Sequence, residues 1–342
     1  MSSMSAEEAS TYTVEQTSKV EPWLLKNLCE PLVKRIPARI SPNMITMANA
    51  VVMFTMFGLG AASPRLEPAP RMWALFGAAV AMFTGMILDS LDGMHARRTK
   101  QTSKLGEFLD HWLDAIHIPL VSGTLGLMLE VHPIVLGMIM LLGAGIYHAQ
   151  LALYYRTAKF VSPPTSGMEA QVIGTAVLAL TGVMFYFAPR YTPWVSWTVW
   201  LIALTAIWAQ VRQWWFFYGR LDRKLDGILS FVLQAAALFG LYYLTGLGRL
   251  SFVLAVALLS FRCSGTYVLR TLAKHSYDGQ DLPTWGFIAA AWGVFWFAPT
   301  LSWMGFSASA LIVGLGAAYQ VARNLYEVRK DYRVLVPAKV AS

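Results

Sequence analysis

The stretch from residue 89 to residue 114, DSLDGMHARRTKQTSKLGEFLDHWLD, carries a dense group of side chains that could do chemistry. Asp89 and Asp92 are three residues apart, which places them on one face of a helix. On a second helix, at 100° per residue, four further side chains fall within an arc of about 100°, namely Glu107, Asp110, His111 and Asp114. Carboxylate oxygens are the ligands that Mg²⁺ and Mn²⁺ prefer, and a metal would relieve their mutual repulsion. The sequence therefore predicts a divalent metal site built by the four aspartates Asp89, Asp92, Asp110 and Asp114.

The connection from His95 to Lys104 adds positive charge beside these carboxylates. Cations next to a metal–carboxylate site suit a diphosphate, whose oxygens can bridge metal ions and accept hydrogen bonds from a guanidinium. We expect Arg97 and Lys104 to contact phosphate, whereas Arg98 and Lys100 are explained as well by membrane topology. The glycines that flank the connection, Gly93 and Gly106, are expected to allow tight turns. An alternative for the aspartates is structural ion pairing in a transporter-like bundle.

The composition shows where such a site must be built. The chain has 342 residues, of which 56% are hydrophobic and 13% charged, and its mean hydropathy is +0.49. A soluble domain of this length would need more charge to cover its surface. The 13 Trp and 14 Tyr fit aromatic belts at membrane interfaces. The two cysteines, Cys29 and Cys263, have no metal-ligand spacing and are interpreted as packing residues. The sequence predicts an all-α, polytopic integral membrane protein.

Apolar segments of about 20 residues, each long enough to span a bilayer, recur along the chain. We expect about ten transmembrane helices, at 44–62, 71–91, 107–129, 133–154, 169–188, 194–217, 228–247, 250–270, 285–304 and 306–326. Residues 1–20 are polar and are expected to form a disordered cytosolic tail, and residues 329–342 a second tail. Residues 21–43 place leucines and Trp23 at near-helical spacing, which predicts an interfacial amphipathic helix broken at Pro37 and Pro42. Packing of this helix on the protein's own cytosolic face is an equal alternative.

The distribution of Lys and Arg predicts the orientation of these spans. With the N-terminus inside, the basic residues of the loops gather on the cytoplasmic side, and the opposite side receives only Arg65, Arg71, Arg190 and Arg249. Both termini are therefore expected in the cytoplasm. The formal charge of +8 is then a topology signal and an attraction to anionic membrane lipids. It does not indicate nucleic-acid binding.

The spacing of the aspartates resembles the signature of the CDP-alcohol phosphotransferase family. The match is Asp89-x-x-Asp92-Gly93-x-x-Ala96-Arg97, then eight residues, then Gly106-x-x-x-Asp110-x-x-x-Asp114. The resemblance implies that Asp89, Asp92 and Asp110 are metal ligands, that Asp114 is a ligand or a base, and that CMP leaves from a CDP-linked donor. It also implies a homodimer and a six-helix catalytic core, here 44–217, followed by four further helices over 218–328. The residues expected as substrate contacts are, from the resemblance, Asn43, Gly93, Ala96, Arg97, Gly106 and Glu169 and, from its charge, Lys104. For Asn43 a helix N-terminal cap is nearly as good an explanation.

The residues around the third aspartate are similar to those of the choline and ethanolamine phosphotransferases, a branch in which a Glu follows the motif glycine and a His follows that aspartate. Glu107 and His111 occupy these positions, and ten spans suit the same branch. The expected reaction transfers phosphocholine or phosphoethanolamine from CDP-choline or CDP-ethanolamine to diacylglycerol. The alternatives are transfer from CDP-diacylglycerol to a small polar alcohol and, from another class, a transporter. The membrane would be endoplasmic reticulum or Golgi in a eukaryote and the inner membrane in a bacterium.

The reaction needs a base, because the hydroxyl of diacylglycerol is a poor nucleophile until a group accepts its proton. His111 is the neutral base nearest the predicted site, and Glu107, one turn earlier, could orient it. Asp114 is the alternative base, although metal binding would make it a weaker proton acceptor. The sequence favours His111 and leaves both open.

Overall fold

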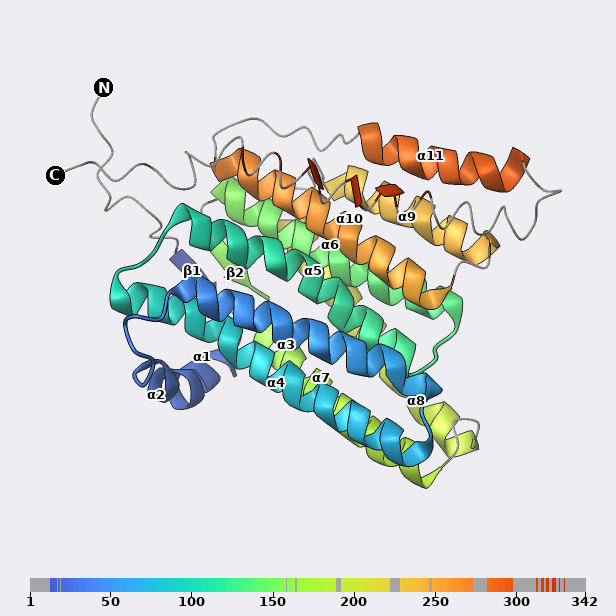
Figure 1. Cartoon of the computed structure of the whole chain (residues 1–342), viewed down its shortest axis with the longest axis horizontal. Coiled ribbons are helices and arrows are strands. Elements are labelled where there is room, and N and C mark those ends of the chain that lie inside the picture. Colours follow the sequence, from blue (N-terminus) through green and yellow to red (C-terminus); the bar gives the residue numbers. More distant parts are fainter. Residues whose placement is uncertain are drawn as a thin grey trace. The chain divides into compact units, whose positions relative to one another are not determined.

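The computed structural model describes residues 13–16, 18, 20–157, 159–163, 165–188, 192–221, 228–245, 248–272 and 282–297, and isolated residues between 312 and 329. The chain packs into two compact units, whose helices and strands are labelled in Figure 1. The first contains residues 1–110, 153–198 and 333–342, and the second contains residues 111–152 and 199–332. Helices α5, α6 and α8 each contribute residues to both units.

The first unit contains the N-terminal elements and the helices that carry most of the motif. Its complete elements are β1 (Thr13–Gln16), α1 (Glu21–Leu24), the π-helix η2 (Leu25–Cys29), α2 (Glu30–Val33), α3 (Pro42–Ala62), the 3₁₀ turn η3 (Ser63–Arg65), α4 (Pro68–Thr99), β2 (Lys159–Ser162) and α7 (Gly167–Phe187). The first turns of α5 (Lys104–Met128) and of α8 (Pro193–Arg220) belong to it as well, as does the last turn of α6 (Pro133–Thr157). The second unit completes α5, α6 and α8 and adds α9 (Ile228–Thr245), α10 (Arg249–Leu272) and α11 (Leu282–Phe297).

Close packing of α3, α4 and α7 builds the centre of the first unit. Glycines allow two of these approaches: a Cβ at Gly85 of α4 would lie 2.5 Å from the sulfur of Met53 on α3, and one at Gly182 of α7 would lie 3.2 Å from the carbonyl oxygen of Met72 on α4. A larger residue at Gly85 would require the Met53 side chain to move, and one at Gly182 would press on the backbone of α4. In the second unit α9 packs against both α10 and α11.

The polytopic helical fold class is confirmed. The first nine predicted spans each fall on one helix, α3 to α11 in order, and most of 306–326 lies outside the described residues. By length and composition, six helices of the described chain could cross a membrane: α3, α4, α6, α7, α8 and α10. Apolar parts of α9 and α11 are shorter, at Ile228–Leu244 and Trp285–Val294.

Helix α4 is longer than the sequence predicted. The predicted span ends at residue 91 and a tight turn was expected at Gly93, but α4 continues to Thr99 and ends at Lys100 in the left-handed conformation, with φ 57°. Gly93 is therefore helical, and Gly106 lies in the first turn of α5. The expectation of turns at both glycines was wrong. The turn that joins α4 to α5, residues 100–103, contains neither glycine.

The N-terminal segment forms consecutive helical elements from Glu21 to Val33. The sequence predicted a helix here that breaks at Pro37, and the observed elements end before that proline. Its apolar side packs on the protein: Leu24, Cys29 and Val33 share a buried cluster with residues of α3, α4 and α7. This is the alternative that the sequence left open, packing on the protein's own surface. Strand β1, which pairs in parallel with β2, lies within the stretch expected to be a disordered tail; residues 1–12 lie outside the described part of the chain.

Candidate active site

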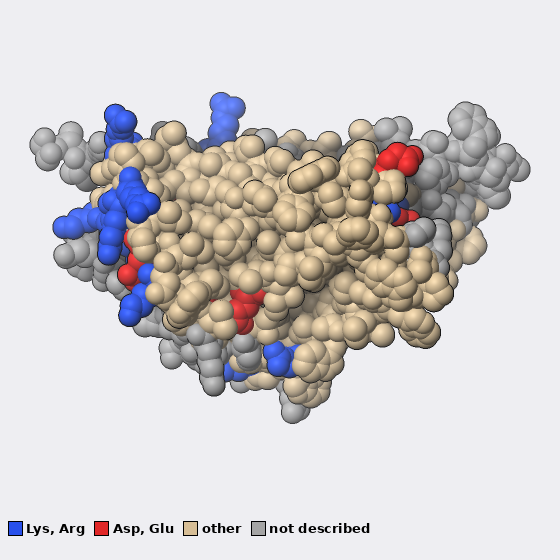
Figure 2. All heavy atoms as spheres, turned by 90° about the horizontal axis from the view of Figure 1, so that it is seen from below, with Lys and Arg blue, Asp and Glu red and all other residues tan. Residues whose placement is uncertain are grey.

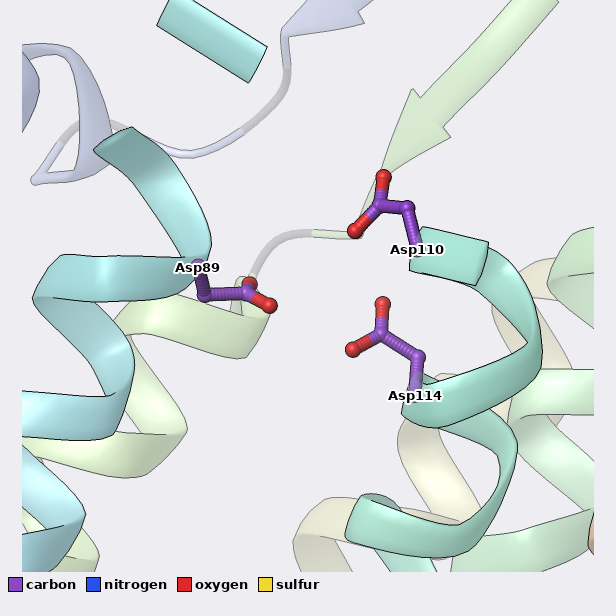
Figure 3. Close-up of side chains that lie close together, drawn as sticks. All are labelled: Asp89, Asp110 and Asp114. Carbon is purple, nitrogen blue, oxygen red and sulfur yellow. The ribbon is translucent and has the colours of Figure 1, made fainter. Parts of the chain in front are cut away.

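Three of the four predicted aspartate ligands lie together. Asp89 comes from α4 and Asp110 from α5, and Asp114 follows Asp110 one turn later on the same uninterrupted helix. Each offers a carboxylate oxygen, and these oxygens lie within 4.8 Å of one another. Figure 3 shows the three carboxylates turned toward a common space. This arrangement could hold a divalent cation by oxygen ligands alone.

Asp92, the fourth aspartate, is held against α3. Its side chain is only 4% exposed. One oxygen accepts a 2.6 Å hydrogen bond from the Thr46 hydroxyl, and the other accepts one of 2.6 Å from the Gly93 backbone N–H. Asp92 nevertheless lies near enough to Asp110 for the two carboxylates to repel each other.

Helix α3 supplies polar partners that the sequence reading missed. Besides Thr46, Asn49 donates a 3.1 Å hydrogen bond from its amide to Asp89 Oδ1. Thr46 and Asn49 are both buried, and with Asn43 they recur every three residues in the first half of a mostly apolar helix. Such a polar stripe in a membrane span indicates a buried polar site and could have identified these residues. Partners of this kind fix the orientation of metal-binding carboxylates.

Arg97 is the basic residue nearest the carboxylates. Its guanidinium folds back over Gly93, where a Cβ would lie 3.4 Å from Nη1, and its charge interacts with Asp92 and Asp110. Ala96 lies half-buried on the same turn, and Lys104 is exposed at the first position of α5, where it interacts with Glu107. These positions agree with a phosphate-binding role for Arg97 and Lys104, which stays a prediction.

Arg98 has a different environment from Arg97. It donates hydrogen bonds to the carbonyl oxygens of Lys34 and Ile36. Its neighbours His95 and Gln101 bond the carbonyls of Ile40 and Ala38, respectively. The end of α4 thus fixes the connection between α2 and α3.

Asn43 reaches the start of α5. A Cβ at Gly106 would lie 3.3 Å from Asn43 Oδ1, so the absence of a side chain at Gly106 makes room for the amide. Ser41, with extended backbone, is the N-cap of α3, so Asn43 is not the cap that the sequence offered as an alternative. At the start of α5, the Ser103 hydroxyl accepts a 3.0 Å hydrogen bond from Gly106 N–H.

Glu107 and His111 have partners that the sequence did not reveal. The Tyr154 hydroxyl donates a 3.0 Å hydrogen bond to Glu107 Oε1 within the first unit. In the second unit, the Tyr147 hydroxyl donates one of 2.7 Å to the backbone carbonyl of His111, whose side chain is buried. The hydrogen bond of the Glu107 carboxylate is therefore with Tyr154. An orienting contact from Glu107 to the His111 ring stays a prediction.

Glu169 is occupied by local structure. It forms a capping box with Ser166 at the start of α7, and its Oε1 also accepts hydrogen bonds from the Ser18 hydroxyl and the Val20 N–H. The Ser-x-x-Glu spacing is the sequence signal of such a box. These bonds give Glu169 a structural role, and the described contacts do not bring it to the three aspartates.

The helices and the acidic group define a multi-pass membrane protein with a site that could bind divalent metal. A family model described as CDP-alcohol phosphatidyltransferase matches residues 39–209, half of the 342 residues, and the chain belongs to this family. The matched range contains every motif residue from Asn43 to Asp114.

Among curated proteins, the chain is similar to phosphotransferases of three organisms. It is 27% identical over 196 residues to choline/ethanolaminephosphotransferase 2 of Arabidopsis thaliana, covering 56% of this chain and 50% of the relative. It is 36% identical over 110 residues to cholinephosphotransferase 1 of Gallus gallus, 31% of each chain. It is 26% identical over 199 residues to choline/ethanolaminephosphotransferase 1 of Saccharomyces cerevisiae, 57% of this chain and 49% of the relative. The chain thus spans half or less of the length of these relatives.

Proposed function

We propose that the protein transfers phosphocholine or phosphoethanolamine from CDP-choline or CDP-ethanolamine to diacylglycerol and releases CMP. The observation that carries this proposal is the group formed by Asp89, Asp110 and Asp114 at the spacing of the family motif. The similar curated proteins, which are named for choline and ethanolamine, support this choice of headgroups.

The carboxylate set fits a hard divalent ion, Mg²⁺ or Mn²⁺. Asp110 lies among Asp89, Asp92 and Glu107, which all repel it, and Arg97 is the cation whose charge offsets them there. Even with Lys104, which interacts with Glu107, two cations do not balance four carboxylates, and oxygen ligands suit these metals. Asp89, Asp110 and Asp114 would hold the ion, with Asp92 as a further proposed ligand. When bound, the metal would neutralise charge on the diphosphate.

The chain's own residues would then bind and orient the substrates. Arg97 and Lys104 are proposed to contact the diphosphate, because both are exposed cations beside the carboxylates. Asn43, Ala96 and the two motif glycines are proposed to border the nucleotide. Glu169, given its capping bonds, would act on the site only through the start of α7.

The proton of the acceptor hydroxyl is proposed to go to His111. As the proton leaves, the oxygen of diacylglycerol forms a bond to the phosphorus of the donor, and the bond from that phosphorus to the CMP oxygen breaks. His111 follows Asp110 directly in α5, and Glu107 lies one turn earlier. Asp114 is the second candidate, because it lies in the carboxylate group itself.

A substrate assay tests this function. Purified protein in detergent would receive labelled CDP-choline, CDP-ethanolamine and CDP-diacylglycerol in parallel with matched acceptors, and Asp89→Asn would serve as the inactive control. We expect CMP release with a CDP-aminoalcohol and diacylglycerol. Consumption of CDP-diacylglycerol alone would indicate a phosphatidyltransferase. Turnover of no donor would contradict the proposal and leave a non-enzymatic role, such as transport.

The orientation of the spans is also proposed. Both termini and the turn between α4 and α5 would face the cytoplasm, in endoplasmic reticulum or Golgi of a eukaryote or the inner membrane of a bacterium. An impermeant thiol reagent should fail to label Lys100→Cys in sealed right-side-out vesicles. Ready labelling would reverse the orientation. A homodimer stays an expectation from the family resemblance.

A further inference from the structure

The outward side of the N-terminal segment carries exposed cations and an exposed tryptophan. Trp23 is 63% exposed, whereas Leu24, Cys29 and Val33 are buried in the cluster shared with α3, α4 and α7. We define the basic face as the exposed cations of this segment and of the adjoining end of α4, which are Lys26, Lys34, Arg35, Arg39 and Lys100. Figure 2 shows basic side chains gathered at the left, the end at which α2 lies in Figure 1.

The connection that carries part of this face has a fixed conformation. Carbonyl oxygens of alternate residues, at positions 34, 36, 38 and 40, accept hydrogen bonds from Arg98, Gln101 and His95 of the α4 end. The side chains of Arg35 and Arg39, which lie between these bonded residues, are exposed. Membrane topology depends on the number of basic residues in a loop and requires no fixed loop. The hydrogen bonds therefore hold this part of the basic face in one conformation, beyond what topology requires.

The positive charge of the basic face favours an anionic partner. Residues 20–40 contain four cations and only two acidic residues, Glu21 and Glu30, and Lys100 adds a fifth cation to the face. An exposed Trp beside basic residues is typical of helices that lie at the headgroup level of a membrane. We propose that the basic face binds the headgroups of anionic phospholipids in the membrane that the protein spans.

Binding at this face would stabilise the folded first unit. The inner side of the segment contributes Leu24, Cys29 and Val33 to the cluster that contains Met86 and Leu91 of α4. The Cys29 side chain also has a hydrogen bond with Ser90, the residue after Asp89. The segment can present its basic face only while these contacts are formed. A ligand that binds only the folded state raises its stability.

A thermal-stability measurement tests the proposal. The full-length protein would be placed in nanodiscs of phosphatidylcholine, with or without phosphatidylglycerol, at low and high salt. We expect phosphatidylglycerol to raise Tm at low salt and high salt to abolish the rise. Neutralising one cation should weaken lipid binding roughly fivefold, and the triple change Lys26→Gln, Lys34→Gln and Arg35→Gln on the order of a hundredfold. Native mass spectrometry would measure independently how much phosphatidylglycerol each variant retains.

Two controls separate specific binding from net charge. The charge-conserving triple change Lys26→Arg, Lys34→Arg and Arg35→Lys should keep the Tm rise, as should Arg65→Gln, which removes an exposed cation outside the face. If the glutamine triple variant fails to fold, the pair Arg39→Gln and Lys100→Gln tests the same face and should reduce the rise.

Several results would overturn the proposal. They are an unchanged Tm rise in the folded variants of the basic face, no rise in the unmodified protein, or loss of the rise in Arg65→Gln. A rise caused by soluble CDP-choline and lost in the glutamine triple variant would assign the face to a nucleotide and contradict lipid binding. None of these readings requires turnover, so they stay informative even if the proposed reaction is wrong.

Discussion

Replacing Thr46 by valine removes one hydroxyl from the site and keeps the size of the side chain. In the folded protein this hydroxyl donates a 2.6 Å hydrogen bond to Asp92, a short bond of the charge-assisted kind. Asp92 is 4% exposed, so water cannot replace the lost donor easily. A hydrogen bond to a charged group contributes about 1.5–3 kcal/mol. We expect Thr46→Val to leave the Asp92 carboxylate less well oriented for a metal.

The effect of Thr46→Val can also be derived from metal affinity. Loss of a residue that orients a metal ligand typically lowers metal affinity about 10–100-fold. At 1.4 kcal/mol per factor of ten, this corresponds to about 1.4–2.8 kcal/mol, which agrees with the value from the hydrogen bond. We therefore expect the Mg²⁺ or Mn²⁺ concentration for half-maximal turnover to rise by that factor, while saturating metal restores most of kcat.

The matched control is Thr55→Val on the same helix. Thr55 is exposed, and its hydroxyl bonds the Val51 carbonyl, away from any carboxylate. Metal titrations of turnover, and of Tm as a reading independent of turnover, would be compared for the two variants. Equal metal dependence in Thr46→Val and Thr55→Val would refute the argument that Thr46 orients Asp92 for metal.

Four further predictions follow from the same contacts. Chelation of divalent metal should abolish turnover, because the carboxylate group needs compensating charge; full turnover in excess EDTA would contradict a metal site. Asp110→Asn should abolish turnover yet raise the Tm of the metal-free protein, since Asp110 is repelled by its neighbours; a lower Tm would argue against that repulsion. His111→Ala should lower kcat about 10²–10⁴-fold with donor binding nearly intact. Asp114→Asn should lose turnover that added metal partly restores. Retained turnover in His111→Ala together with no rescue of Asp114→Asn by metal would make Asp114 the base. Cys29 should react slowly with iodoacetamide until the protein is unfolded, because burial raises the pKa of its thiol. A hydrogen bond with Ser90 lowers that pKa by a smaller amount. Mass spectrometry in a Cys263→Ser background would measure the reaction.

The sequence predicted the helices well because most of them are apolar segments of about bilayer length. Its errors concern the ends of helices. Gly93 suggested a turn, but the last turns of α4 are stabilised by bonds from Arg98 and its neighbours to the 34–40 connection, which are tertiary contacts invisible in local sequence. The β1–β2 pair was missed for the same reason, since it joins residues 13–16 to residues 159–162.

For the candidate site, the motif predicted which carboxylates come together but not what holds them. Asp89, Asp110 and Asp114 were predicted from spacing. The bond from Tyr154 to Glu107 joins α6 to α5, and no pattern in the sequence pairs these residues. Thr46 could have been found, because a buried polar stripe is visible in the first span; its choice of Asp92 as partner could not.

The length of α4 bears on where the carboxylate group would lie in a bilayer. Its 32 residues extend about 48 Å, well beyond the roughly 30 Å of a bilayer's hydrocarbon layer. Asp89 lies roughly 32 Å along the helix from Pro68, so a hydrocarbon layer that begins at Pro68 would end near Asp89. A water-soluble nucleotide donor could reach that level from the aqueous side, and a lipid hydroxyl already resides there. Neither reactant would have to cross the hydrophobic layer, so a channel through the helices would be unnecessary.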